Sequence, residues 1–291
     1  MRVHLVDGTY ELFRHHFGAP AEAREEVGNA AATRGVLGSV LQLVADGATH
    51  VGVATDHVIE SFRNEMWPTY KTSAGVPETL LAQFPVVEHA LEAMGFVVFP
   101  MVELEADDAL ASVAAASAGD PDVEQVIICT PDKDLGQCVS GRRVVQLDRR
   151  KGVVFDEAGV QAKFGVPPES IPDYLALVGD SADGYPGLRG WGAKATAAVL
   201  SRYGHIENVP RLGDRWEVDV RGARSLANTL SEQHELALLF RDLATLRVDP
   251  SLLDRPDDLR WTGPTAAFAE VCEHLGAPGL PERAERLASR R

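Results

Sequence analysis

The sequence predicts an α/β protein with a mostly parallel sheet that carries helices on both faces. Two observations lead to this prediction. Short apolar runs alternate with helical segments and are joined by short links, which is the pattern of parallel strands connected by helices. Several of these apolar runs also end in an acidic residue, namely Asp7, Asp56 and Asp132. From residue 144 the pattern changes to a hairpin and a series of helices, which predicts a second, mainly helical region.

The strands and helices of the first region follow in order along the chain. Four apolar runs predict strands, at Arg2–Val6, His50–Thr55, Phe96–Pro100 and Gln125–Thr130. Helical spacing of apolar residues predicts helices at Tyr10–Phe17, Gly35–Ala45, Pro77–Met94 and Glu105–Ala118. The segment Ala19–Arg34 is rich in Ala and Glu and is expected to be a loosely structured connection. Ser61–Lys71 mixes aromatic and basic residues.

The second region begins with an expected β-hairpin, formed by Val144–Leu147 and Val153–Phe155. Its predicted helices cover Asp156–Phe164, Pro168–Val178 and Lys194–Tyr203. The remainder, to Arg291, indicates helices and Pro/Asp turns with no recognisable chemistry. We therefore expect two domains, residues 1–150 and 151–291.

The amino-acid composition indicates in which cellular compartment the protein works and which kinds of partner it binds. The three cysteines are few, odd in number and not in zinc spacing, so a reducing cytoplasm is expected. No apolar stretch approaches the length of a membrane span, so no membrane partner is expected. The net charge of −15 argues against non-specific binding of polyanions by the whole surface. A nucleic-acid site stays compatible with that charge, because metal-binding acids add to the negative count and bound cations reverse it locally.

The stretch Glu105–Asp134 concentrates acidic residues. It carries eight acids and a single base, Lys133, with clusters at Glu105–Asp108 and Asp132–Asp134. Two carboxylates ~4 Å apart repel by roughly 1 kcal/mol even in bulk water. Hard divalent cations such as Mg²⁺ and Mn²⁺ prefer oxygen ligands and would remove this cost. For Glu105–Asp108 alone, acids that merely complement a helix dipole are an equally good explanation.

The positions of the acids favour the metal interpretation. In parallel sheets, ligands gather outside the carboxyl ends of the strands, where Asp7, Asp56 and Asp132 fall. Glu105 and Asp108 are spaced i, i+3 and so share one face of the helix after the third strand. A single acid at a strand end is usually an ordinary surface residue. Four separate elements that direct acids to one edge indicate a metal site.

A glycine-punctuated segment follows a second acidic pair, Asp180 and Asp183. It runs from Gly184 to Gly192 and leads into a helix with Lys194 in its first turn. Glycines allow close approach of the backbone to a ligand, and a helix N-terminus offers free N–H groups to a phosphate. A glycine-rich turn alone is usually just a turn. After a D-x-x-D pair and before Lys194, it predicts a device that grips a nucleic-acid backbone.

The ordered motifs resemble the 5′-nuclease family, which comprises flap endonucleases and the 5′–3′ exonuclease domain of bacterial DNA polymerase I. The motifs are V-D-G, T-D, F-R…Y-K, E-A-D-D, D-K-D-L and G-D-S-x-D-G-x-P-G…G-x-G-x-K, between Val3 and Leu246. The resemblance implies a PIN-like nuclease core with a helical arch near residues 61–94. It also implies a following helix–three-turn–helix DNA-binding region.

The resemblance further implies two Mg²⁺ or Mn²⁺ ions held by nine acids. One ion is assigned to a first group: Asp7, Asp56, Glu105, Asp107 and Asp108. The other is assigned to a second group: Asp132, Asp134, Asp180 and Asp183. Several of these contacts are expected to run through water.

Basic and aromatic residues receive roles from the same resemblance. Four match the family's catalytic positions: Arg14, Arg63, Tyr70 and Lys71. Lys71 is expected to face the scissile phosphate at the base of the arch. Five belong to the hairpin that holds duplex DNA: Gly187, Arg189, Gly190, Gly192 and Lys194. The resemblance also suggests a K⁺ ion bound at this hairpin.

Three positions depart from the family pattern. Thr72-Ser73-Ala74-Gly75 follows Lys71 where relatives carry an arginine, which puts electrostatic help from the arch in doubt. Pro131 replaces a glycine before D-K-D, and Trp191 replaces a smaller aliphatic residue in the hairpin. The chain shows no polymerase domain, so it resembles the stand-alone bacterial enzymes.

The expected activity is hydrolysis of phosphodiester bonds near the 5′ end or flap junction of branched, flapped or gapped DNA, by a two-metal mechanism. Such enzymes act in DNA replication and repair, and RNA–DNA primer ends are a further expected substrate. Two alternatives stay open. One is a PIN-type ribonuclease, and the other is a DNA-junction-binding homologue with weak or no catalysis.

Overall fold

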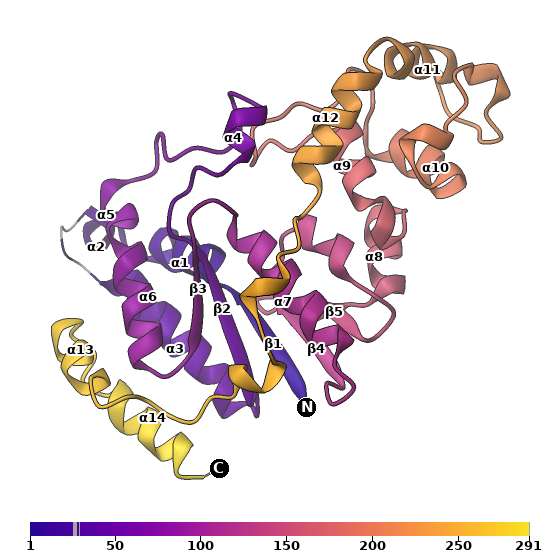
Figure 1. Cartoon of the computed structure of the whole chain (residues 1–291). Helices are drawn as coiled ribbons and strands as arrows, with labels where there is room; N and C mark the ends of the chain where they lie inside the picture. The colour runs from indigo at the N-terminus through magenta and orange to yellow at the C-terminus, as the bar shows by residue number, and fades with distance from the viewer. Residues whose placement is uncertain (26–27, 29, 291) are drawn as a thin grey trace. The chain divides into compact units, whose positions relative to one another are not determined.

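The computed structural model describes residues 1–25, 28 and 30–290. The chain forms two compact units, and each consists of more than one segment (Figure 1). Unit 1 comprises Met1–Ile59, Ser73–Thr130 and Val248–Arg291. Unit 2 comprises Glu60–Thr72 and Pro131–Arg247. The expected division at residue 150 stays a prediction, because compact packing units need not be folding domains.

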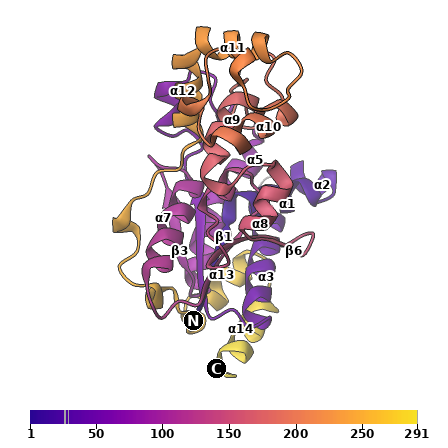
Figure 2. The ribbon, with the colours of Figure 1, turned by 90° about the vertical axis from the view of Figure 1, so that its right-hand side faces the viewer.

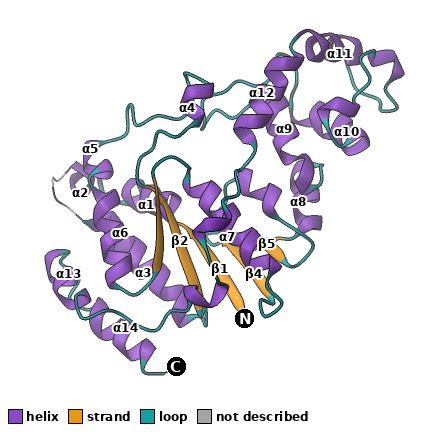
Figure 3. Ribbon diagram, in the orientation of Figure 1, coloured by secondary structure: helices purple, strands orange, loops and turns teal. Residues whose placement is uncertain are grey.

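Unit 1 contains a parallel sheet in which the strands run in the order β3-β2-β1-β4 (Figure 3). The strands are β1 (Arg2–Asp7), β2 (His50–Asp56), β3 (Val97–Met101) and β4 (Gln125–Cys129). Val3 pairs with His50 of β2 and with Val126 of β4, so β1 is central. All seven residues of β2 are buried, as expected for a strand covered on both faces. The four predicted strands and their parallel arrangement are confirmed.

Helices cover both faces of this sheet (Figure 2). The helices of unit 1 are α1 (Gly8–Gly18), α2 (Ala21–Glu25), α3 (Ala31–Ala45), α5 (Glu78–Leu81), α6 (Gln83–Ala93), α7 (Ala106–Gly119), α13 (Phe268–His274) and α14 (Leu280–Ala288). On one face α1 and α6 contact the strands, and α3 packs against both of them. On the other face α7 contacts all four strands. The predicted layering is confirmed.

The expected loosely structured connection over Ala19–Arg34 was wrong in part, and so was the expected start of the helix that follows it. The segment expected to be loose contains α2, and α3 begins at Ala31 rather than at Gly35. Residues 26, 27 and 29 of that segment lie outside the described residues. The early start of α3 is stabilised by Thr33, whose backbone N–H and hydroxyl both donate to Gln83 Oε1 at 3.1 Å. The spacing of apolar residues within one segment cannot predict a hydrogen-bond partner 50 residues away.

The expected single helix over Pro77–Met94 is divided into α5 and α6 at Ala82. Pro85 lies in the first turn of α6, where a missing backbone N–H costs no intrahelical hydrogen bond. In the middle of one long helix the same proline would remove a hydrogen bond. The segment therefore divides into two helices, which places Pro85 in the first turn of the second one.

The C-terminal segment of unit 1 packs back on α6 and on the link between α6 and β3. Trp261 stacks on Phe96 at 5.8 Å between ring centroids, and its indole N–H donates to Met94 O at 2.8 Å. Short 3₁₀ turns at Pro250–Leu252 and Pro256–Leu259 precede α13 and α14. Within the described part of the chain, no helix has the length and apolarity needed to cross a membrane.

Unit 2 is mainly helical and begins its second segment with a β-hairpin. The strands β5 (Val144–Asp148) and β6 (Val153–Phe155) pair antiparallel, as predicted. Its helices are α4 (Arg63–Met66), α8 (Glu157–Phe164), α9 (Ile171–Val178), α10 (Ala193–Tyr203), α11 (Ala223–Glu232) and α12 (His234–Ala244), and its 3₁₀ turns are Asp134–Cys138, Pro168–Ser170, Ile206–Asn208 and Gly213–Arg215. Helix α12 packs along α9 around a core that includes Tyr185 and Phe240.

Candidate metal-binding site

Three acids of unit 2 meet in one cluster. Carboxylate oxygens of Asp134, Asp180 and Asp183 all lie within 4.8 Å of one another. Asp134 and Asp180 are buried, at 6% and 2% exposure, while Asp183 is partly exposed. Among the residues that the structure describes, this is the one such group of acids, histidines or cysteines.

A closed turn holds Asp180 and Asp183 in this cluster. The backbone of Asp180 exchanges two hydrogen bonds with Tyr185, N to O at 2.9 Å and O to N at 3.0 Å. Asp180 Oδ1 also accepts from Ala182 N at 2.9 Å. Because the turn is closed at both ends, Asp183 is brought back beside Asp180. Asp134 begins the 3₁₀ turn after β4, and its N–H donates to Oδ1 of the exposed Asp132 at 3.2 Å.

The environment of Asp134 disfavours the ionised form of its carboxyl. Burial raises the pKa of the Asp134 carboxyl well above its ordinary value, and the charges of Asp132, Asp183 and Asp180 raise it further. Oδ1 of Asp134 is buried and accepts no hydrogen bond from the described residues. A buried carboxylate oxygen without a donor, beside two more carboxylates, is suited to a hard cation. These side chains therefore fit a divalent metal ion.

Lys133 supplies a cation from the chain itself. Its Nζ lies 2.6 Å from Asp180 Oδ2. Burial alone would lower the pKa of Lys133, but the hydrogen bond to Asp180 and the charges of Asp180, Asp134 and Asp132 raise it overall. The sequence interpretation gave no role to Lys133. The available signal was that Lys133 is the single base within the acidic stretch.

A segment from the first part of the chain closes over the acidic turn. The backbone N–H of Lys71 donates to Asp183 O at 3.0 Å. The indole of Trp67 and the hydroxyl of Thr69 both donate to Gly184 O at 3.1 Å. Lys71, half-buried, is thereby fixed by its backbone beside the cluster, although 112 residues separate it from Asp183.

Arg63 and Tyr70 of this segment are buried rather than open to a ligand. Arg63 is 1% exposed, and its guanidinium donates to Leu243 O at 2.8 Å and to Thr245 O at 3.0 Å. Tyr70 is 3% exposed and belongs to the core of unit 2. The contacts of Arg63 join the segment Glu60–Thr72 to the end of α12.

Unit 1 holds the other predicted acids at the carboxyl edge of its sheet. Asp7 ends β1, accepts from Tyr10 N at 2.8 Å and also accepts from the Thr130 hydroxyl at 2.8 Å. Asp56 ends β2 and accepts from Ala106 N at 2.7 Å, at the start of α7. These bonds join the ends of β1 to β4 and of β2 to α7. Asp7, Asp56 and the start of α7 thus lie at the carboxyl edge of unit 1, whereas Asp132 belongs to unit 2. The expected convergence of all four elements on one metal site stays a prediction.

Helix α7 begins with the rest of this group. Asp108 Oδ2 accepts from Glu105 N at 3.0 Å, a local bond that caps the helix. Glu105 and Asp108 are buried, whereas Asp107 is half-buried. Of the nine predicted acids, five thus belong to unit 1 and four to unit 2. This division matches the two groups assigned to separate ions.

Arg14 lies on α1 in unit 1. Its Nη2 is 2.6 Å from Oε2 of the buried Glu11 and 2.9 Å from Nε2 of His15. Glu11 also accepts from the Ser39 hydroxyl at 2.8 Å. Arg14 is a third exposed, so its guanidinium is both oriented by Glu11 and accessible.

The glycine-punctuated segment forms a turn that leads into α10. Gly187 has φ +68°, and a Cβ there would lie 2.4 Å from Gly179 N, so only glycine fits this position. Gly190 has φ +87°, and Gly192 directly precedes α10. Arg189 and Lys194 are exposed.

Trp191 anchors this hairpin. Its side chain is buried, packs on Trp216 at 5.9 Å between ring centroids, and donates its indole N–H to Leu226 O at 3.3 Å. The unusual tryptophan in the motif therefore ties the hairpin to α11. Its indole serves packing rather than contact with a ligand.

Comparisons with known proteins agree with this architecture. The family model described as 5′-3′ exonuclease, N-terminal resolvase-like domain, matches residues 2–165. The family model described as 5′-3′ exonuclease, C-terminal SAM fold, matches residues 166–267. The combination of an α/β domain with acids at its sheet edge and a helical SAM-fold domain defines a class of nucleases.

Two curated relatives are about a third identical to this chain over the aligned residues. The 5′-3′ exonuclease of Aquifex aeolicus is 30% identical over 258 residues, covering 88% of either chain. DNA polymerase I of Pseudomonas aeruginosa is 32% identical over 258 residues, or 85% of this chain and 27% of that protein. The chain thus spans only about a quarter of the polymerase's length.

A solved structure of the bacteriophage T5 flap endonuclease, a pseudo-enzyme–product complex with DNA and metal ions, shares the fold. Its TM-score is 0.67 at 17% identity, with 99% of this chain and 98% of that chain covered. The chain belongs to the 5′-3′ exonuclease family, whose members are nucleases. The family and the fold class predicted from the motifs are confirmed.

Proposed function

We propose that this chain is a structure-selective 5′–3′ exonuclease and flap endonuclease that hydrolyses phosphodiester bonds in DNA. The observation that carries the proposal is the cluster of Asp134, Asp180 and Asp183, in which one buried carboxylate oxygen has no hydrogen-bond donor among the described residues. Family membership supplies the reaction class. The proposed substrates are branched, flapped or gapped DNA and RNA–DNA primer ends.

The nine acids are proposed to hold two divalent ions, Mg²⁺ or Mn²⁺. The group in unit 1 ends β1 and β2 and begins α7, and the group in unit 2 includes the three-acid cluster. Such ions supply an activated water and stabilise the leaving oxygen of an in-line displacement. The chain's own part is to hold the carboxylates in place through the backbone bonds of Asp7, Asp56 and Asp180.

Two basic residues are proposed to act on the reacting phosphate. Lys71 has its backbone fixed beside Asp183, so its ammonium would stabilise charge that develops on the phosphate oxygens. Arg14 is accessible and held by Glu11, so it would orient the same strand. Arg63 and Tyr70 are proposed as positioning residues, because both are buried and Arg63 donates to backbone carbonyls.

The hairpin Gly187–Lys194 is proposed to hold duplex DNA. Its glycines allow close approach of a phosphate, and the start of α10 offers free N–H groups beside the exposed Lys194. Contacts of this kind bind the backbone without reading bases, which gives selectivity for structure rather than sequence. A K⁺ ion bound by main-chain carbonyls of the hairpin is part of this proposal. The proposed DNA-binding domain covers residues 151–291, after a nuclease core at 1–150.

Cleavage of a panel of labelled substrates tests the proposal. Flapped, gapped, nicked and single-stranded DNA, each with a 5′ label, are incubated with Mg²⁺, with Mn²⁺, with Ca²⁺ and with excess chelator. We expect cutting at the 5′ end or flap junction in Mg²⁺ or Mn²⁺, binding without cutting in Ca²⁺, and no turnover in chelator. Robust turnover in chelator would contradict metal-dependent catalysis.

One observation favours a second candidate, a DNA-junction-binding protein with weak catalysis. No arginine follows Lys71 within Thr72–Gly75, so this segment lacks a positive charge that the family pattern leads us to expect. In the same panel, tight binding with a cleavage rate that stays at the chelator background would support this candidate. An RNA version of each substrate tests the ribonuclease alternative.

A further inference from the structure

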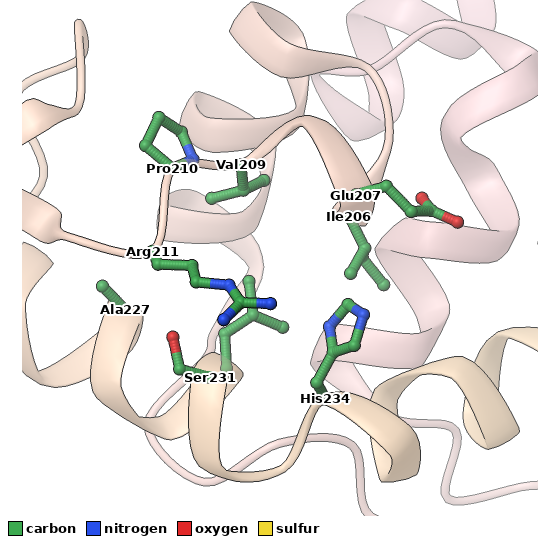
Figure 4. Close-up of a pocket in the computed structure, with 9 residues that line it drawn as sticks. Ile206, Glu207, Val209, Pro210, Arg211, Ala227, Ser231 and His234 are labelled. Atoms are coloured by element: carbon green, nitrogen blue, oxygen red, sulfur yellow. The ribbon is translucent and has the colours of Figure 1, made fainter.

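Unit 2 contains a pocket that none of the proposed site residues lines. Its volume is about 200 Å³, and it lies between the loop 206–211 and the junction of α11 with α12 (Figure 4). The floor is apolar and is formed by residues such as Ile206, Val209 and Leu230, which are all buried. The rim is polar.

Three side chains with hydrogen-bond donors point into the pocket. Figure 4 shows Arg211 and Ser231 extending from one side and His234 from the other. Arg211 and Ser231 are exposed, and His234 is half-buried. Within the part of the chain that the structure describes, none of these three side chains makes a hydrogen bond or an ion pair. Their donors are therefore available to a ligand.

The acidic residue that lines the pocket is already compensated. Glu207 lines the pocket, but its carboxylate lies 2.6 Å from Arg241 Nη1. In Figure 4 this carboxylate points away from Arg211 and His234. Arg241 is fixed in turn by Asp173, at 3.3 Å. The pocket consequently presents positive charge in a protein whose net charge is −15.

Arginine, a hydroxyl and an imidazole N–H together suit a phosphate group. The guanidinium fork matches the oxygens of a phosphate, and charge-assisted hydrogen bonds of this kind are about twice as strong as neutral ones. His234 also begins α12, an 11-residue helix whose first N–H groups have no intrahelical acceptor. We propose that this pocket binds a phosphate group of the nucleic-acid substrate. The inference deepens the proposed function and rests on it.

The pocket is joined to the DNA-binding hairpin through α11. Trp191 of the hairpin donates to Leu226 O at the start of α11, and Leu230 and Ser231 of the pocket lie about one turn further along the same helix. A phosphate in the pocket and a phosphate at the hairpin would therefore be held by one rigid element. The pocket supplies a second anchor for the same substrate.

Binding of fluorescein-labelled duplex DNA in Ca²⁺, followed by anisotropy over a range of salt concentrations, tests this anchor. The variants are Arg211→Ala, and Ser231→Glu, which places a negative charge in the pocket. The matched control is Arg215→Ala, another exposed arginine of unit 2 that does not line the pocket. Each duplex is prepared with a 5′-phosphate and with a 5′-hydroxyl, to separate a terminal phosphate from a backbone phosphodiester.

We expect Arg211→Ala to weaken binding roughly three- to tenfold and to lower the salt slope by about 0.9, the value for one lost phosphate contact. Ser231→Glu should weaken binding at least as much, and Arg215→Ala less than either. If the pocket variants lose the same affinity for both duplexes, the pocket binds a backbone phosphate. If they lose affinity only for the 5′-phosphorylated duplex, the pocket binds the terminal phosphate.

If wild type binds DNA and both pocket variants bind as the control does, the phosphate pocket is wrong and the proposed function stands. If wild type binds no DNA, the proposed function itself is wrong, and the pocket inference with it.

Discussion

At the scale of single residues, the metal-free protein keeps a buried carboxylate in an unfavourable environment. Asp134 is surrounded by Asp132, Asp180 and Asp183, and Lys133 compensates only part of this charge. Burial and the neighbouring charges raise its folded-state pKa. The favourable contribution of the protonated form is therefore complete below the ordinary range near 4 and is lost as the pH rises through the raised pKa.

The substitution Asp134→Asn removes this charge without changing the size of the side chain. In chelator we expect the variant to melt at a higher temperature than wild type at pH 8, with a difference that shrinks towards pH 5. The stabilisation by added Mg²⁺ should be smaller in the variant, because a ligand is lost. Thermal melts across this pH range measure both effects, with Asp219→Asn, at an exposed position of unit 2 outside the predicted metal-binding acids, as control. A variant less stable than wild type at pH 8 would mean that Asp134 has a structural role.

Sequence reasoning selects acids more readily than it selects their neighbours. The acids are visible because they cluster along the chain, but the partner of Asp180 depends on how the turn folds. The position of Tyr185 was equally hidden: its buried hydroxyl accepts no bond from the described residues, and burial, followed by the charges of Asp134 and Asp183, raises its pKa. Only packing brings a phenol and three carboxylates together.

Arg63 provides a prediction that separates positioning from catalysis. Removal of its guanidinium leaves the carbonyls of Leu243 and Thr245 without this donor and opens a cavity. We expect Arg63→Ala to lower the free energy of unfolding by roughly 2–4 kcal/mol, as measured in urea. Arg63→Lys should lie between wild type and Arg63→Ala, because one ammonium cannot replace the planar fork. Unchanged stability with a slower cleavage rate would instead place Arg63 on the reacting phosphate.

At the scale of elements, the strands were predictable and the helix ends were not. An apolar run such as His50–Thr55 is buried on both faces, so its composition alone identifies it. The start of α3 depends on Gln83, and the break between α5 and α6 on the position of Pro85 in a helical turn. Contacts between residues far apart in the sequence determine where these helices begin and end. The periodicity of apolar residues within one segment does not predict such contacts.

The contact between the segment Glu60–Thr72 and the acidic turn depends on one glycine. Gly184 has φ +80°, and a Cβ there would lie 2.0 Å from Thr69 O. We expect Gly184→Ala to lower the free energy of unfolding by roughly 2 kcal/mol or more and to slow cleavage, because the backbone that positions Lys71 must move. Gly192→Ala is the stability control, since a Cβ there meets no atom within 4 Å. Equal unfolding free energies for the two variants would contradict this account.

At the scale of the whole molecule, the proposed function gives the acids and the bases different tasks. The predicted acids come from both units, which explains why no single stretch of sequence contains the full set. The order and spacing of the motifs still identified the family, because each motif contributes one part of the set. What the sequence could not provide was the phosphate pocket, whose three donors come from separate places between residues 211 and 234.

The last prediction separates binding from chemistry. Lys194 is exposed at the start of α10, and Lys71 is held beside the acidic cluster by its backbone bond to Asp183. If the hairpin binds duplex and the cluster performs hydrolysis, Lys194→Ala should weaken DNA affinity and lower the salt dependence by about one phosphate contact. Its cleavage rate at saturating DNA should change little, because the lost contact is equally strong in the ground state and the transition state.

Lys71→Ala should show the opposite pattern, with near-normal affinity and a single-turnover rate lower by roughly 10²-fold or more, because its charge acts mainly in the transition state. Anisotropy in Ca²⁺ and rapid-quench cleavage in Mg²⁺ measure the two quantities independently. A loss of affinity with an unchanged saturated rate would make Lys71 a guide for the strand. That result would also account for the missing arginine in Thr72–Gly75, since a strand guide needs little charge beyond the lysine itself.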